Sequence, residues 1–185
     1  MKIKKCVLVI GHKEKAPGAK NTKTGITEFD FNDDLARRIE KRVIGVNIQR
    51  VYRDTYAALP GKINSINPDF IISLHLNAAF NGNASGTEVL YYYRSKKGKE
   101  MAEILQDYIV SHLALPDRGV KPIDARGRGS HLLKRTKAPA VIVEPFFIDN
   151  DSDLALAQKD LDGFAQAYAN AIDEIAKFIG DQNEM

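Results

Sequence analysis

Residues 69–77 read DFIISLHLN, and this stretch decides the class of fold. The run FIISL would be apolar on both faces of an extended chain, which is typical of a strand with neighbours on both edges of a parallel sheet. His75 comes directly after it, and the Gly/Asn-rich stretch 80–86 follows, so we expect the histidine at the carboxyl end of the strand. Strand ends are where α/β sheets present functional groups. A lone histidine between two leucines is more often a core residue than a ligand, so other residues are needed to interpret it.

Further apolar runs predict the other strands of this sheet. Residues 3–10, 43–52, 86–93 and 138–143 are rich in aliphatic and β-branched residues, and residues 119–123 form a short extended piece.

Helical patterns separate these runs. A helix is expected to begin at the N-cap Thr27, a short one to lie within 56–67, and amphipathic helices to cover 96–113 and 161–179. The alternation predicts an α/β fold, a single domain with a mixed, mostly parallel twisted β-sheet flanked by helices on both faces. Because no internal repeat or linker is visible, we expect residues 1–185 to form one domain.

Composition limits the classes of function. The chain has 185 residues, 44% hydrophobic and 28% charged, which is ordinary for a soluble globular protein. The net charge of +3 is scattered and forms no basic run, so nucleic-acid binding is not expected. The single cysteine, Cys6, cannot form an intramolecular disulfide. No stretch approaches the roughly 20 apolar residues of a membrane span, and the N-terminus lacks a signal-peptide pattern. We therefore expect a soluble monomer that is made in the cytosol and is not bound to a membrane.

Four chemically active side chains occupy the ends of predicted elements: His12, Glu28, His75 and Glu144. His12 follows the run VLVI, Glu144 follows AVIV, and Glu28 lies where a loop enters a helix. Two histidines and one glutamate, with water in the fourth position, are the ligands of one type of catalytic zinc site. A second carboxylate could then transfer protons. The residues alone do not settle which glutamate has which role.

These residues also have simpler interpretations. A glutamate in the first turn of a helix, such as Glu28, is favoured by the helix dipole without any catalytic role. Glu144 ends an apolar run and needs a partner, because an isolated buried charge is very costly, and an arginine such as Arg118 or Arg135 would serve. The basic stretch DARGRG at 124–129 either closes over the site or, more simply, is an exposed hairpin.

Six short motifs, in the same order, resemble those of the zinc-dependent N-acetylmuramoyl-L-alanine amidases, the Amidase_3 family. Each motif alone is weak, but together they cover nearly the whole chain, from about Lys4 to Ile179. The motifs are Gly11-His12 with Gly18-Ala19, Thr27-Glu28-Phe29-Asp30-Phe31-Asn32, Ser73-Leu74-His75-Leu76-Asn77-Ala78, Gly86-Thr87-Glu88-Val89, Asp117-Arg118-Gly119-Val120-Lys121, and Pro139-Ala140-Val141-Ile142-Val143-Glu144 with a nearby Asn150.

The resemblance implies one catalytic amidase domain, with a motif-bearing core at about 4–179. It implies that His12, Glu28 and His75 bind Zn²⁺ and that Glu144 is the catalytic carboxylate. Asn77 and Arg118 lie in two of the motifs and are expected to bind substrate. The implied reaction is hydrolysis of the amide bond between N-acetylmuramic acid and L-alanine in peptidoglycan, as in a cell-wall lytic amidase or an endolysin.

The chain departs from the family pattern in two places. The family often has Asp-Pro-Gly-His-Gly-Gly at the first ligand, whereas residues 9–14 read VIGHKE, so this loop is expected to differ in shape. The Gly-Phe that usually follows the catalytic glutamate is replaced by Pro145-Phe146-Phe147, which stiffens the chain and is expected to alter the pocket floor. Some regulated members insert a plugging helix between the Gly-Thr-Glu and Arg-Gly motifs. Only 30 positions separate Glu88 from Arg118 (118 − 88), so we expect an open site.

Two other functions stay open from the sequence. The same site could serve a zinc peptidase or deacetylase that cuts another amide, because the ligand set does not encode the bond. A non-catalytic wall-binding module could also retain the fold. The lack of a visible export signal fits an endolysin released on lysis, or a fragment of an exported protein, and in either case we expect action on the cell wall.

Overall fold

A mixed β-sheet forms the centre of the protein. The computed structural model describes residues 3–79 and 81–181. Within them, six strands are ordered β2-β1-β3-β6-β4-β5. The strands are β1 (Lys4–Ile10), β2 (Val46–Tyr52), β3 (Phe70–Leu74), β4 (Thr87–Tyr92), β5 (Asp117–Ile123) and β6 (Ala140–Glu144). β1 runs parallel to β2 and β3, β3 to β6, and β4 to β5, whereas β4 and β6 are antiparallel. The predicted mixed, mostly parallel sheet is confirmed.

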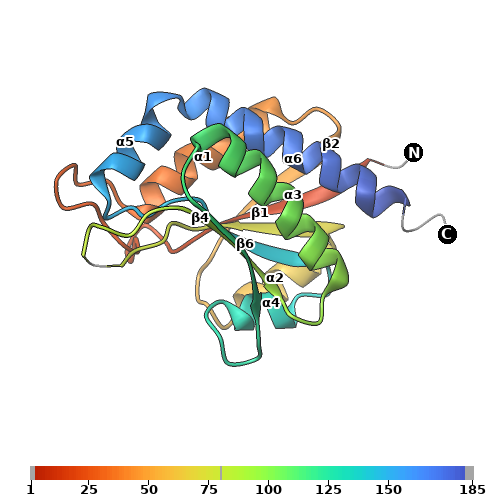
Figure 1. Cartoon of the computed structure of the whole chain (residues 1–185). Coiled ribbons are helices and arrows are strands. Elements are labelled where there is room, and N and C mark those ends of the chain that lie inside the picture. Colours follow the sequence, from red (N-terminus) through yellow and green to blue (C-terminus); the bar gives the residue numbers. More distant parts are fainter. Residues whose placement is uncertain (1–2, 80, 182–185) are drawn as a thin grey trace.

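Helices cover both faces of this sheet, as predicted (Figure 1). They are α1 (Glu28–Arg42), α2 (Leu59–Ile66), α3 (Lys96–Leu113), α4 (Ser130–Arg135), α5 (Asp151–Lys159) and α6 (Leu161–Asp181). Helices α1, α3, α5 and α6 bury one apolar core against the sheet, and α2 and α4 bury a smaller one on the opposite face. The small helices leave part of that second face open for a cavity.

The quoted stretch is the central strand β3, with β1 on one edge and β6 on the other. All five of its residues are buried, which explains its continuous apolar run. Ser73 is paired with Val9 of β1 and with Ile142 of β6, so these three side chains lie in one row across the sheet. Because side chains alternate between faces, His75 and Glu144 lie on the same face two residues further on.

Three elements have bounds that differ from the sequence expectation. The strand expected at 43–52 begins only at Val46, because the N–H of Val43 still bonds the carbonyl of Ile39 at the end of α1. The piece expected at 119–123 is a longer edge strand that begins at Asp117. The helix expected within 56–67 covers 59–66.

Two short helices were not expected from the sequence. Helix α4 has only six residues, too few for a helical period to be recognised. Helix α5 is capped by the side chain of Asn150, which accepts hydrogen bonds from the N–H groups of Ser152 and Asp153. Asn is a preferred N-cap residue, so this signal was present in the sequence.

The segment between β4 and β5 does not form a plug. Its helix, α3, packs on α6 and on β4, on the face opposite to the cavity. Within the described residues, no helix combines the length and the apolar character that crossing a membrane requires.

Candidate metal centre

His12 lies immediately after β1 in a backbone conformation that few residues other than glycine adopt, with a φ of 66°. Gly11 precedes it and donates its N–H to the carbonyl of Leu74 at 2.9 Å. A Cβ at Gly11 would lie 2.5 Å from that carbonyl oxygen and 2.8 Å from the ring of His75. Only glycine permits the ends of β1 and β3 to approach so closely, and this approach brings the two histidines together.

Glu28 is the first residue of α1. Thr27 caps the helix through a hydrogen bond from the N–H of Asp30, and the N–H of Glu28 bonds the carbonyl of Ala19 at 2.8 Å. These bonds direct the Glu28 side chain inward, where it is 3% exposed. Its two oxygens accept hydrogen bonds from the N–H groups of Ala19 (3.3 Å) and Leu76 (3.0 Å).

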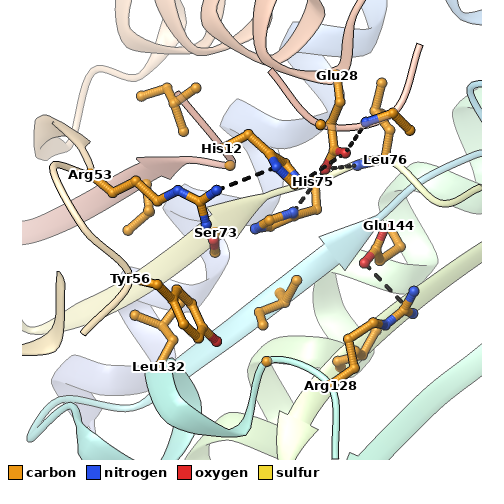
Figure 2. Close-up of a pocket in the computed structure, with 18 of the residues that line it drawn as sticks. His12, Glu28, Arg53, Tyr56, Ser73, His75, Leu76, Arg128, Leu132 and Glu144 are labelled. Carbon is orange, nitrogen blue, oxygen red and sulfur yellow. Dashed lines mark hydrogen bonds and ion pairs between the residues drawn. The ribbon is translucent and has the colours of Figure 1, made fainter. Parts of the chain in front are cut away.

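The two histidines contact opposite oxygens of this one carboxylate. Oε2 of Glu28 lies 3.0 Å from Nε2 of His12, and Oε1 lies 2.8 Å from Nδ1 of His75. The imidazole rings are 5.3 Å apart at an angle of 70°. Figure 2 shows the three side chains converging from β1, α1 and β3. The sequence therefore named three residues that the fold brings to one point.

The electrostatics of the cluster favour an ionised Glu28. Burial alone would raise the pKa of its carboxyl, but hydrogen bonds and charge interactions with His12 and His75 outweigh that effect and lower the pKa to about 2. Glu28 is thus a carboxylate at any physiological pH. A carboxylate is the form that binds a metal ion.

The donor set of this cluster fits a divalent metal ion. One ligand atom from each of His12, Glu28 and His75 lies within 4.8 Å of the others. Two imidazole nitrogens and one carboxylate oxygen are the protein ligands of catalytic zinc sites that keep a fourth position for water or substrate. Hard cations such as Mg²⁺ and Ca²⁺ prefer oxygen ligands throughout.

Glu144 ends β6 and lines the same cavity as the cluster (Figure 2). The residue is 4% exposed, and its Oε2 has no hydrogen-bond partner among the described residues. Burial raises the pKa of its carboxyl to about 7, with smaller opposing contributions from His75 and Arg128 and reinforcing ones from Glu28 and Glu88. A carboxyl group with this proton affinity can both take and give a proton near neutral pH.

The arginine partner of Glu144 is not one that the sequence suggested. Arg128 provides it, with Nη2 at 3.6 Å from Oε1 of Glu144. Arg118 instead bonds Glu88 at 2.9 Å. Arg135 forms no ion pair within the part of the chain that the structure describes. The expectation failed because Arg128 lies in a loop, and the sequence does not encode the path of that loop over the sheet.

Asn77 and Arg118, the expected substrate-binding residues, both contact Glu88 rather than the cavity. Asn77 is 5% exposed and donates its amide N–H to Glu88 at 2.9 Å. The guanidinium of Arg118 lies over the ring of Phe147, 5.1 Å from its centre. Neither residue lines the cavity, so their contact with substrate stays a prediction.

The Pro145-Phe146-Phe147 segment does not form the pocket floor, which corrects the sequence expectation. Phe146 is fully buried against Phe31 in the larger core, and the segment does not line the cavity. The floor comes from the row Val9, Ser73 and Ile142, which lies one side-chain layer below His75 and Glu144. The chain turns inward after β6, and the apolar runs of sequence do not reveal the direction of that turn.

The cavity has a volume of about 590 Å³, within the range of small-molecule sites. Its wall also contains two arginines and a tyrosine that were not singled out as site residues from the sequence: Arg53, Arg128 and Tyr56. Arg128 belongs to the 124–129 loop, which had been interpreted more simply as an exposed hairpin. Arg53 lies 3.4 Å from Nδ1 of His12, and it carried no signal in the sequence.

Comparison with known proteins identifies one family. The model of the Amidase_3 family, described as N-acetylmuramoyl-L-alanine amidase, matches residues 6–174. The chain is 30% identical to the N-acetylmuramoyl-L-alanine amidase LytC of Bacillus subtilis over 151 residues, which cover 77% of the chain and 29% of LytC. It is 31% identical to the probable cell wall amidase LytH of Staphylococcus aureus over 163 residues, which cover 85% of the chain and 53% of LytH. The chain thus spans about half or less of these relatives.

Solved structures with the same fold agree with this result. The catalytic domain of the CD27L endolysin targeting Clostridia difficile superposes with a TM-score of 0.76 at 28% identity, covering 91% of the chain and 96% of that domain. An N-acetylmuramoyl-L-alanine amidase from Clostridium difficile 630 has a TM-score of 0.79 at 24% identity, covering 91% and 94% of the two chains. At 24% identity, the similarity to this second structure shows only that the fold is shared.

Proposed function

Because the chain belongs to the Amidase_3 family of N-acetylmuramoyl-L-alanine amidases, we propose that it is a zinc-dependent enzyme that hydrolyses the amide bond between N-acetylmuramic acid and L-alanine in peptidoglycan. The observation that carries the proposal is the arrangement of the cavity. Three ligand atoms lie within 4.8 Å of one another, and a buried carboxyl with a pKa of about 7 lies at the end of a neighbouring strand. Residues 1–185 would then act as one catalytic domain on the cell wall.

In this proposal His12, Glu28 and His75 hold the zinc ion. When bound, zinc would supply a Lewis acid that polarises the substrate carbonyl and lowers the pKa of water. Glu28 is ionised before the metal binds, and its bond from the N–H of Leu76 fixes the carboxylate at the end of β3. The three ligands come from β1, α1 and β3, so the packed core determines their positions.

Glu144 would transfer the proton. Its free Oε2 accepts a proton from the attacking water, and the same carboxyl then delivers it to the nitrogen of the departing L-alanine. Strand β6 is buried along its whole length, which holds this carboxyl at a fixed distance from the cluster. The products are a muramic-acid glycan and a stem peptide with a free L-alanine amino group.

Mass spectrometry of digested peptidoglycan tests the proposal. Purified sacculi are incubated with the zinc-loaded protein, and the Glu144→Gln variant is the matched control. The proposal predicts soluble stem peptides that begin with L-alanine and carry no sugar, and about 10²–10⁴-fold slower release of them with the variant. Cleavage between stem residues would instead identify a peptidase. A mass loss of one acetyl group per sugar would identify a deacetylase, and either result would overturn the proposed bond.

A further inference from the structure

Two buried glutamates lie directly opposite each other on β4 and β6, and one of them, Glu144, lines the cavity. Glu88 of β4 pairs with Glu144 of β6 across the antiparallel edge, and the two residues are 5% and 4% exposed. Like charges directly opposite on neighbouring strands destabilise a sheet, and a buried carboxylate needs a partner. The pair therefore requires a cation that reaches both groups.

Arg128 is that cation. Its Nη2 lies 3.0 Å from Oε1 of Glu88 and 3.6 Å from Oε1 of Glu144, and its Nη1 donates to the side-chain oxygen of Asn77 at 3.2 Å. Figure 2 shows Arg128 extending toward Glu144 from the side of the cavity opposite to Arg53. One guanidinium thus bridges the two opposed carboxylates.

The loop carries Arg128 to this position because a glycine follows it. Gly129 has a φ of 76°, and a Cβ there would lie 2.2 Å from Cδ1 of Ile142. The backbone after Arg128 therefore lies directly on β6, the strand that ends in Glu144. Most of the loop is exposed, as expected from the sequence, but Arg128 and Gly129 contact the site.

The two glutamates differ in how many donors they bind. Glu88 receives hydrogen bonds from Arg118 (2.9 Å), Asn77 (2.9 Å) and Arg128 (3.0 Å). Among the described residues, Glu144 has the longer Arg128 contact and one oxygen without a partner. Glu88 is thus held as an anchor, while Glu144 keeps lone pairs for a proton.

We propose that Arg128, anchored by Glu88 and Asn77, is a positioning residue that holds Glu144 in place and offsets the charge of Glu88 during the reaction. This inference rests on the proposed function, because there Glu144 is the proton carrier. Arg128 acts through Glu144 and is not itself assigned to the substrate.

The other titratable groups whose charges interact with Glu144 come from four elements. They are His75 after β3, Glu28 of α1, Glu88 of β4 and Tyr168 of α6. Glu28 and Glu88 raise the pKa of Glu144, whereas His75 and Arg128 lower it. Burial raises the pKa of the Tyr168 phenol well above its ordinary value, so this group stays neutral. Of the two groups that lower the pKa of Glu144, Arg128 is therefore the one that can be replaced without changing a proposed metal ligand.

The test compares three variants with one control. Arg128→Gln removes the charge, and Arg128→Lys retains a charge without the planar guanidinium. Glu88→Gln removes the opposing carboxylate. Arg126→Gln is the control, because this exposed residue of the same loop forms no ion pair within the described residues. The Glu144 carboxyl is titrated by ¹³C NMR in metal-free protein and assigned by its loss in Glu144→Gln. The pH dependence of kcat/KM is measured on zinc-loaded protein.

The proposal predicts shifts of opposite sign. Arg128→Gln should move the Glu144 titration and the acidic limb of kcat/KM upward by about one pH unit, since a nearby opposite charge lowers a carboxyl pKa by about 1–3. Glu88→Gln should move the Glu144 titration and the acidic limb downward. Arg128→Lys should move them upward by less than Arg128→Gln does, and Arg126→Gln should leave them as in the parent protein. If Arg128→Gln does not fold, an upward shift in Arg128→Lys and a downward shift in Glu88→Gln provide the same test.

Equal or absent shifts in Arg128→Gln and Glu88→Gln would overturn the inference. The NMR titration does not require hydrolysis, so it separates this failure from failure of the proposed function. A protein without amidase activity that still shows the opposite NMR shifts would contradict the proposed function but support the interaction of Arg128 with Glu144. An active protein without those shifts would agree with the proposed function but overturn the inference about Arg128.

Discussion

Oε1 of Glu28 lies 2.8 Å from Nδ1 of His75, although the two residues are 47 positions apart in the chain. The contact forms because α1 begins beside the end of β3, where the N–H of Leu76 also bonds the same oxygen. A carboxylate held this way has its oxygens directed at two imidazoles before any metal arrives.

Replacing His75 with alanine should remove metal binding. His75 supplies one of three proposed ligands, and even loss of a residue that only supports a ligand costs about 10–100-fold in metal affinity. We expect at least that loss for zinc in His75→Ala. Competition with a chromogenic chelator measures the affinity. His112→Ala is the matched control, because His112 packs on Phe164 away from the cavity and should leave the affinity unchanged.

Replacing Glu144 should separate binding from chemistry. Glu144 is outside the three-residue cluster, so Glu144→Ala and Glu144→Gln should retain the zinc content of the parent protein. Hydrolysis should fall by about 10²–10⁴-fold, the usual contribution of a positioned proton carrier. Atomic absorption and release of stem peptides measure the two properties. Undiminished hydrolysis in either variant would show that Glu144 does not move the proton.

Gly18→Ala should damage the cluster specifically. A Cβ at Gly18 would lie 2.6 Å from Oε2 of Glu28 and 2.7 Å from the ring of His12. Gly25 has nearly the same φ, 79° against 83°, but its Cβ would meet only Lys20 at 3.9 Å. Both alanine variants should therefore lose about 1–2 kcal/mol of stability from the left-handed backbone.

Only Gly18→Ala should also lose zinc affinity, by about tenfold or more, as expected when the surroundings of a ligand are disturbed. Urea unfolding gives the stability, and chelator competition gives the affinity. Equal zinc affinities in the two glycine variants would contradict the tight fit between Gly18 and the ligands.

The metal-free protein should lose stability in acid through Glu28. Its folded pKa of about 2 is below the ordinary value of 4.5, so its contribution is present above about pH 4.5 and is lost as the pH falls toward 2. The difference corresponds to about 3 kcal/mol. Urea midpoints between pH 5 and 2 should fall more steeply for the parent protein than for Glu28→Gln. Parallel curves would contradict the predicted interaction with the two histidines.

The three proposed ligands and the proposed base could be found from the sequence for a physical reason. In an open α/β sheet, residues that follow neighbouring strands gather at one edge, and His12, His75 and Glu144 each follow or end a buried apolar run. The position of Glu28 is a weaker signal, because a glutamate is common in the first turn of any helix. Its role depends on how α1 approaches β3, which is a tertiary contact.

The surroundings of Glu144 could not be predicted in the same way. Arg128 reaches it from a loop, and the path of that loop depends on the close contact between Gly129 and Ile142. The Pro145-Phe146-Phe147 segment was expected to alter the pocket floor, but Phe146 lies in the core against Phe31, because the chain turns inward after β6. Such contacts join segments far apart in sequence, and the periodicity of apolar residues carries no information on them.

Zinc content and sacculus clearing, measured on one preparation, test whether His12, Glu28 and His75 form a catalytic zinc site. The protein is assayed as purified, after removal of metal with a chelator, and after Zn²⁺ is added back. We expect one zinc per chain, loss of clearing when the metal is removed, and recovery of clearing when Zn²⁺ is added back. A protein that binds no zinc, or one that clears sacculi equally well without it, would contradict the assignment of His12, Glu28 and His75 as a catalytic metal centre.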